Sequence, residues 1–172
     1  MRDVRAESLS IGQELVRSLS AGWQPPPIAP PFHLPPSESC YSSHQAQLLQ
    51  MLEGDDTYVH KSRGGYGMVG LAAVAATAVG NSARRRRAER EAAARFRPVD
   101  QGTLHVTNRR FALQGRTQWV DLWYSDIRMS YCDGAAVTLE LSSIPPIQLH
   151  AWPAFAVFVM FRYLAYGEVV QL

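Results

Sequence analysis

Between residues 102 and 150 the hydrophobic positions recur mostly at every second residue. In the first run Leu104 and Val106 alternate with polar neighbours, which is the period of a strand that buries one face. Asn108 and the pair Asp133-Gly134 supply turn signals, since Asn and Gly tolerate the left-handed backbone that two-residue hairpins need. The pattern predicts strands at 102–107, 110–114, 119–123, 126–132, 136–141 and 147–150, and upstream at 38–51 and 57–62.

The run 126–132 places Ile127, Met129 and Tyr131 on one face at period two. The aromatic residues near it allow two interpretations. In a small barrel such side chains belong mostly to the core, whereas at an exposed rim they would anchor a partner or form a membrane-interface belt. The aromatic residues concerned are Trp119, Trp123, Tyr124 and Trp152.

After the last strand, residues 152–166 predict a helix that is apolar over most of its surface. Pro153 suits the first turn of a helix, and Gly167 suits its end. Such a helix has to be buried or bound to a partner. Full burial of each large apolar side chain is worth about 1.5–3 kcal/mol, so we expect the helix to be a main stabiliser. Its large apolar residues are Phe155, Val157, Phe158, Val159, Phe161 and Leu164.

Residues 102–111, Gly-Thr-Leu-His-Val-Thr-Asn-Arg-Arg-Phe, resemble the hairpin motif of bacterial pleckstrin-homology-like and GRAM-like domains. The stretch 124–127 resembles the strand entry that follows this hairpin in those domains, and the closing helix occupies the position of their capping helix. Leu34 and Glu38 keep the spacing of the run that opens the first strand of the family. The resemblance implies an α+β fold, a seven-stranded half-open barrel with a C-terminal capping helix, which binds lipid or protein and does not catalyse.

The domain organisation follows from changes in composition along the 172 residues. Residues 1–22 predict an amphipathic helix, and residues 23–36, with seven prolines, predict a linker of polyproline II conformation. We assign residues 37–168 to the barrel and residues 67–96 to a long helical insertion within it. The apolar side of the first helix would carry Val4, Ile11, Leu15, Val16 and Leu19.

A stretch of 20 residues without a charged side chain, from 64 to 83, opens the insertion. As a helix it would span about 30 Å, the hydrocarbon thickness of a bilayer. Many of its residues are Gly or Ala, and Ala72, Ala76 and Gly80 form a stripe of small residues suited to close helix contact. A helix packed on the barrel, a membrane-inserted element and a mobile insertion all remain open. The candidate contact residues are Val69, Leu71, Val74 and Val79.

The basic charge of the chain is concentrated in one block. Seven arginines and two glutamates between residues 84 and 97 give a local charge of +5, which leaves −3 for the rest of a chain of formal charge +2. Basic residues beside an apolar segment attract anionic lipid headgroups, by about 1 kcal/mol each, although a solvated helix face has the same composition. The candidate contacts are Arg84, Arg85, Arg86, Arg87 and Arg90.

Two other classes of ligand fit the sequence less well. Lys61 and Arg63 are the only basic residues near the first strands that could contact a lipid headgroup in the manner of the family. Nucleic acid would also attract the arginine block, but no aromatic residue interleaves with it before Phe96. We therefore do not expect a nucleic-acid partner.

Catalytic and metal-binding patterns are weak throughout the sequence. The five histidines are scattered without ligand spacing, so we expect no metal site and no cofactor. Cys40 and His44 would lie about 13 Å apart on a strand, too far for a nucleophile and its base. Cys40 and Cys132 make no disulfide framework, and no signal-peptide pattern opens the sequence, which favours a reducing cytoplasmic setting.

Together these features predict a non-enzymatic adaptor attached to the inner face of a membrane. The Gly/Ala helix and the arginines would attach it, and the barrel would bind an unidentified protein. The alternative is a soluble protein–protein interaction module, in which the Gly/Ala helix packs within the fold or at a homodimer interface.

Overall fold

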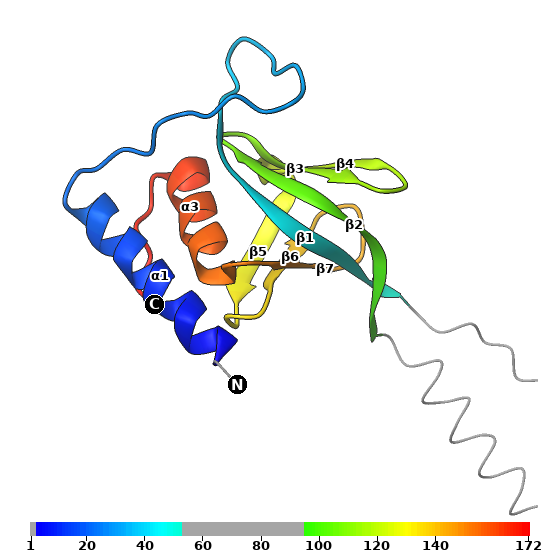
Figure 1. Ribbon diagram of the computed structural model, residues 1–172. Coiled ribbons are helices and arrows are strands. Elements are labelled where there is room, and N and C mark those ends of the chain that lie inside the picture. The colour runs from blue at the N-terminus through cyan, green and yellow to red at the C-terminus, as the bar shows by residue number, and fades with distance from the viewer. Residues whose placement is uncertain (1–2, 53–94) are drawn as a thin grey trace, which may run out of the picture. The chain divides into compact units, whose positions relative to one another are not determined.

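The computed structural model describes residues 3–52 and 95–172, which form two helices, seven strands and one 3-10 turn (Figure 1). The helices are α1 (Val4–Ser20) and α3 (Ala154–Tyr166), and the short 3-10 turn η1 covers Tyr124–Asp126. The strands are β1 (Cys40–Leu52), β2 (Arg95–Thr107), β3 (Arg110–Gly115), β4 (Trp119–Trp123), β5 (Ile127–Cys132), β6 (Val137–Leu141) and β7 (Ile147–Ala151).

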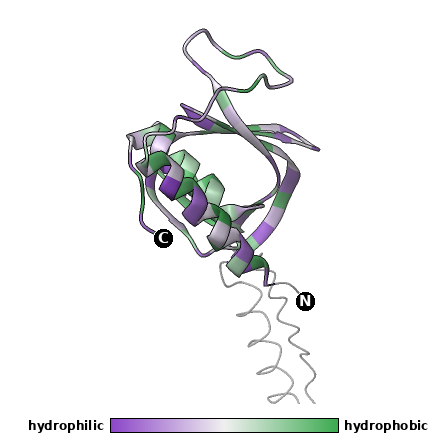
Figure 2. Cartoon of the chain, turned by 60° about the vertical axis from the view of Figure 1, so that its left-hand side comes forward, coloured by the Kyte–Doolittle hydropathy of each residue, from purple (hydrophilic) through white to green (hydrophobic). Residues whose placement is uncertain are grey.

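The seven strands form one sheet in the order β4-β3-β2-β1-β7-β6-β5. The sheet curls on itself, and Figure 2 shows it from a side on which the helices lie in front of it. Neighbouring strands run antiparallel, with Leu104 of β2 opposite Leu113 of β3 and Leu48 of β1 opposite Leu149 of β7. Within the described residues β4 and β5 are the two ends of the sheet. This confirms the expected α+β class and a seven-stranded half-barrel.

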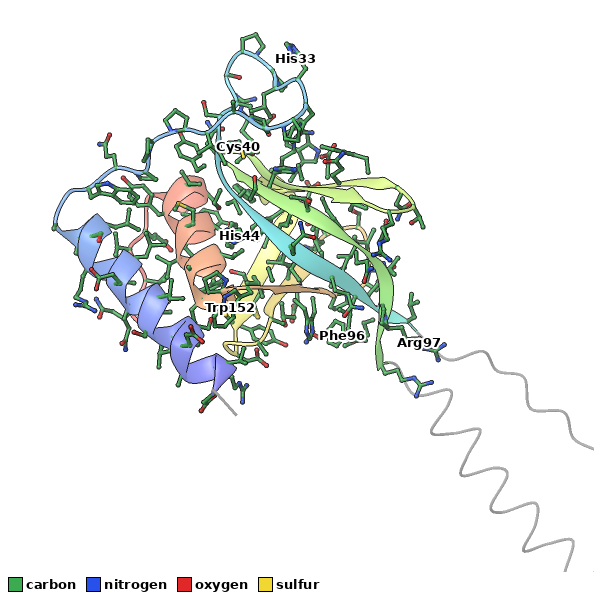
Figure 3. The ribbon with its side chains drawn as sticks, viewed as in Figure 1. His33, Cys40, His44, Phe96, Arg97 and Trp152 are labelled. Carbon is green, nitrogen blue, oxygen red and sulfur yellow. The ribbon has the colours of Figure 1, made fainter. Side chains whose placement is uncertain are left out.

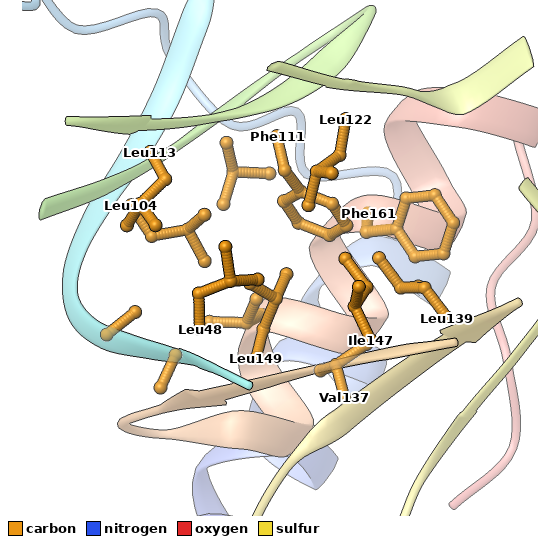
Figure 4. Close-up of a cluster of buried hydrophobic side chains, with 14 of the residues drawn as sticks. Leu48, Leu104, Phe111, Leu113, Leu122, Val137, Leu139, Ile147, Leu149 and Phe161 are labelled. Carbon is orange, nitrogen blue, oxygen red and sulfur yellow. The ribbon is translucent and has the colours of Figure 1, made fainter. Parts of the chain in front are cut away.

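The core fills the concave side of the sheet (Figure 4). Alternating positions supply it as the period-two pattern predicts, and Leu104, Val106, Val137 and Leu139 are fully buried. Helix α3 closes the core with Phe161, whose ring lies 5.1 Å from that of Phe111 between centroids. Gly167 ends α3 in the left-handed conformation (φ 69°), as the sequence predicts.

Helix α1 packs against α3 through a face that partly matches the expected one, since Leu19 is buried and Leu15 packs against the core. Its buried residues are Ser8, Gly12 and Leu19, whereas Val4 and Ile11 are exposed. A Cβ on Gly12 would come within 2.7 Å of the Cβ of Phe155, so the two helices approach too closely for a larger residue. Ser8 Oγ accepts a hydrogen bond of 3.1 Å from the backbone N–H of Phe155, and this satisfies a free donor at the start of α3. Small residues therefore decide this contact.

The expected common face of Ile127, Met129 and Tyr131 in β5 is wrong. The pairing with β6 shifts register between Ile127 and Met129, which makes Arg128 the extra residue of a β-bulge. The bulge reverses the alternation of the strand. Ile127 and Cys132 pack against the core, while Met129 and Tyr131 are 57% and 50% exposed.

Strand β2 starts earlier than the helix propensity of the arginine-rich stretch suggests. Residues 95 and 96, the expected end of the helical insertion, already belong to β2, and so does Pro98. The insertion boundary at residue 96 is therefore wrong, because pairing with β1 overrides local helix propensity. Residues 57–62 and the rest of the insertion lie outside the described residues.

The proline-rich stretch is held on the barrel. We call residues 23–39 the strap. Ile28 forms an isolated bridge with Cys40, and the side chain of Asn108 binds the strap twice, accepting from Ser39 N (2.9 Å) and donating to Ser37 O (3.2 Å). Within the described residues only glycines have positive φ, so Asn108 serves through its side chain and not through the expected left-handed backbone. The division into linker and barrel at residue 37 stays a prediction.

Candidate binding surface

Strand β4 has two chemically different faces. Val120 and Leu122 point to the core, and the outward residues are Trp119, Asp121 and Trp123, which we call the β4 face. The two tryptophans are 42% and 38% exposed, an unusual exposure for such large apolar side chains. Their Cα atoms are about 13 Å apart along the strand. Because β4 is at an end of the sheet, this face also borders a strand edge that no other strand of the described residues pairs with.

A chain of polar contacts holds both indole rings. Asp121 Oδ1 accepts a hydrogen bond of 2.8 Å from Trp119 Nε1, and Asp121 Oδ2 lies 2.8 Å from Arg110 Nη1. The guanidinium of Arg110 in turn lies over the Trp123 ring, 4.7 Å from its centroid. Arg110 is directly opposite Trp123 in the β3–β4 register. The two exposed rings therefore have fixed positions before any partner binds.

Arg110 is anchored from below by a buried carboxylate. Its Nε donates to Glu38 Oε1 at 2.9 Å, and the Glu38 side chain is 0% exposed against 11% for Arg110. Glu38 lies near the end of the strap, two residues before β1, and its N–H donates to Pro35 O. The cation is thus paired with two carboxylates beside the aromatic surface of the β4 face.

The strap extends the β4 face at one end. The Phe32 ring meets Trp119 edge-on at 4.7 Å and meets His105 at 4.9 Å. His105 Nδ1 lies 2.8 Å from Ser43 Oγ, and burial lowers the pKa of this imidazole. In contrast to Trp119, the Nε1 of Trp123 has no hydrogen-bond partner among the residues that the structure describes. A directed side-chain donor is therefore available on this surface.

A polar hollow of about 370 Å³ lies elsewhere on the outside of the sheet. Its floor includes Gly102, which faces Gly115 across β2 and β3, so close that a Cβ on Gly102 would lie 1.9 Å from Gln114 O. Arg116 and His150 supply its basic groups. The two basic groups alone do not indicate which ligand this hollow would bind.

Asp100 fixes the β3–β4 turn beside this hollow. Its carboxylate accepts hydrogen bonds from the backbone N–H groups of Arg116, Thr117 and Gln118, and from the Thr117 hydroxyl at 2.8 Å. Burial acts to raise the pKa of Asp100, but the hydrogen bonds to the charged form outweigh it and lower the pKa to about 2.

Replacing Asp100 with Asn should therefore destabilise the protein in a pH-dependent way. A depressed folded-state pKa contributes stability above the unfolded pKa of about 3.9 and loses it as the pH falls through the folded value. We expect the difference in unfolding free energy between wild type and Asp100→Asn to be constant above about pH 5 and to shrink between about pH 4 and 2. Urea titrations across that range measure it, and a difference that grows on acidification would contradict the assignment.

The thiols and histidines in the described part of the chain do not form a catalytic pair. Figure 3 places Cys40 at the strap end of β1 and His44 further along the strand near Trp152, and His33 lies on the strap. His44 Nδ1 lies 3.0 Å from Trp152 O, and burial raises the pKa of the Cys40 thiol. Burial also raises the pKa of Cys132, to about 11. Neither thiol has the lowered pKa of an activated nucleophile.

In residues 3–52 and 95–172, no three His, Cys, Asp or Glu side chains come together in a way that could hold a metal ion. No helix of the described part has the length and apolar character to cross a membrane. The expected absence of metal, cofactor and catalysis remains a prediction.

The residues expected to contact lipid, nucleic acid or a partner helix all lie outside the described residues. These are Lys61, Arg63, Val69, Leu71, Val74, Val79, Arg84, Arg85, Arg86, Arg87 and Arg90. The β4 face could have been predicted from the sequence. The alternation of Trp-Val-Asp-Leu-Trp puts both tryptophans on the face of the strand away from its two core residues. The core interpretation is right for Tyr124, which is buried, and wrong for Trp119, Trp123 and Trp152, which are exposed.

Comparison with known proteins does not identify a ligand for this surface. No protein-family model, no curated protein and no solved structure matches the chain.

Proposed function

We propose that this chain is a non-enzymatic binding protein whose barrel serves as a platform for another protein. The observation that carries the proposal is the β4 face, two half-exposed tryptophans held by one network of polar contacts on an edge strand. Tryptophan is among the residues that dominate binding energy at protein interfaces. Rings that are already fixed lose little conformational entropy on binding. The arrangement therefore suits a binding surface.

The fold identity is part of the same proposal. A seven-stranded half-barrel with a helix across its core, together with the hairpin motif at 102–111, supports a pleckstrin-homology-like domain of the GRAM-like type. We also propose a cytoplasmic setting.

A photo-crosslinking experiment tests the platform. A benzophenone amino acid is introduced at Gln118, an exposed residue beside the β4 face, and a matched probe is placed at Met129 on the opposite edge strand. Illumination in cells of the source organism should give a discrete adduct from position 118 and not from 129. Trp119→Ala combined with Trp123→Ala should abolish that adduct with a small change in stability, because both rings are half-exposed. An adduct that persists in the double variant would contradict the proposal.

Peripheral membrane attachment is the second part of the proposed function, and the sequence supports it. Twenty residues without a charge precede the four consecutive arginines, Arg84 to Arg87. If these side chains hold the protein on anionic lipid, their replacement with Ala should abolish sedimentation with anionic liposomes, because each contributes about 1 kcal/mol near the surface. Replacement of Arg109, an exposed arginine of the barrel, is the matched control and should leave binding unchanged. Unchanged binding of the fourfold variant would contradict the attachment mechanism.

A further inference from the structure

From the geometry of the β4 face we infer that its ligand is an uncharged, proline-rich segment in the polyproline II conformation. The inference rests on the proposed function and names the chemistry of the partner. Such segments bind aromatic surfaces because they are already extended and lose little entropy when they dock. The β4 face offers two such surfaces along one line, at Trp119 and Trp123.

The spacing of the rings fits a short extended segment. Their strand positions are about 13 Å apart. A polyproline II helix rises about 3.1 Å per residue, so four residues cover that distance. A single segment of four or five residues can therefore contact both indoles, whereas a helix would cover the same span with about nine residues.

The charges around the rings favour a neutral ligand. Arg110 is paired with Glu38 and Asp121, and Asp121 also accepts from Trp119 Nε1. A charged ligand would have to compete with these internal contacts. An available side-chain donor is Trp123 Nε1, and a polyproline II backbone carries carbonyl groups that no internal hydrogen bond occupies. Trp123 therefore has a matching acceptor on such a segment.

The chain itself already places a proline-flanked segment on this surface. Pro30 and Pro31 precede Phe32 in the strap, and the Phe32 ring contacts Trp119 edge-on. Pro25, nearer the start of the strap, is buried. The surface next to Trp119 thus accommodates the residue that follows Pro30 and Pro31, while the Trp123 ring at the other end lies under Arg110. We place the incoming segment along β4, from Trp119 toward Trp123.

The test is an NMR titration of the full-length protein with 15N-labelled tryptophan. The four indole N–H signals, from Trp23, Trp119, Trp123 and Trp152, are assigned by single Trp→Phe variants. The probe is a decaproline peptide with blocked ends. The comparison probes are a Gly-Ser peptide of equal length, a Val-Thr peptide that favours strand conformation, and zwitterionic vesicles.

We expect decaproline to shift the Trp119 and Trp123 signals saturably, with Trp23 and Trp152 unmoved. Trp123→Ala should weaken the peptide about tenfold or more, as at a binding hot spot, and Trp152→Ala, at an equally exposed tryptophan elsewhere, should not. Trp123→Phe keeps a ring and loses the indole donor. Weaker peptide binding by this variant would show that the indole N–H donates a hydrogen bond to the peptide.

Three results would overturn the inference. They are a response to the Gly-Ser peptide equal to that of decaproline, a response to the Val-Thr peptide or the vesicles alone, and no response of Trp119 and Trp123 to any probe. In each case a tryptophan-dependent adduct from position 118 would still support the protein-binding platform, with a partner of other chemistry. Loss of that adduct as well would remove the proposed function.

Discussion

Replacing Arg110 with Ala is expected to reduce the free energy of unfolding by about 3–5 kcal/mol, because it leaves Glu38 as an unpaired buried carboxylate. The Glu38 side chain has no exposed surface, and Oε1 has Arg110 as its partner at 2.9 Å. Its other oxygen, Oε2, is buried without a hydrogen bond within the described residues, so this acid depends on the arginine. The loss should appear as a lower urea midpoint at neutral pH.

Arg109→Ala is the control for this prediction. Arg109 is the exposed neighbour of Arg110 in the β2–β3 turn, and its removal should change stability by less than about 0.5 kcal/mol. Arg110→Ala should also move the indole signal of Trp123, whose ring it covers, more than that of Trp152. A loss of stability no larger than that of the control would show that the pair contributes little to the fold.

Phe161→Ala is expected to be about as damaging, with a loss of about 3–5 kcal/mol. Phe161 is fully buried on α3, and its ring contacts those of Phe111 and Tyr124 at 5.1 and 4.8 Å. Removal of the ring opens a cavity where the helix meets both parts of the curled sheet, and rigid strands limit its collapse. Denaturant titration measures the loss.

Phe158→Ala provides the matched comparison for Phe161→Ala. Phe158 lies one turn earlier on α3 and packs against the core while only partly buried. Its removal should cost less, because water can reach part of the space that the ring leaves. Equal losses from the two variants would mean that α3 does not close the core through Phe161.

The parts of the fold that could be predicted from the sequence depend on the alternation of hydrophobic residues and on strong helix terminators. Leu104, Val106, Val137 and Leu139 alternate and are buried, and Gly167 ends α3. Such features are local, so a window of a few residues contains them.

The predictions that failed depend on contacts between segments that are distant in the sequence. The bulge at Arg128 comes from pairing with β6, and the start of β2 at Arg95 comes from pairing with β1. The hydrophobic pattern within α1 places Leu19 correctly, but the burial of Gly12 depends on how closely Phe155 approaches it. The β4 face needs Arg110, which lies on β3, and Glu38, which lies before β1. No spacing along the chain indicates that these two residues pair beside the tryptophans of β4.

The bulge at Arg128 has a consequence for how copies of the chain behave in a crowded solution. Within the described residues β5 is an edge of the sheet, and it carries Met129 and Tyr131 as exposed side chains. A straight edge of that composition would template pairing with another molecule and start aggregation. The extra residue interrupts the regular row of backbone donors and acceptors, so a second strand cannot continue in register past it. Deleting Arg128 would restore the regular row and convert this edge into an aggregation site.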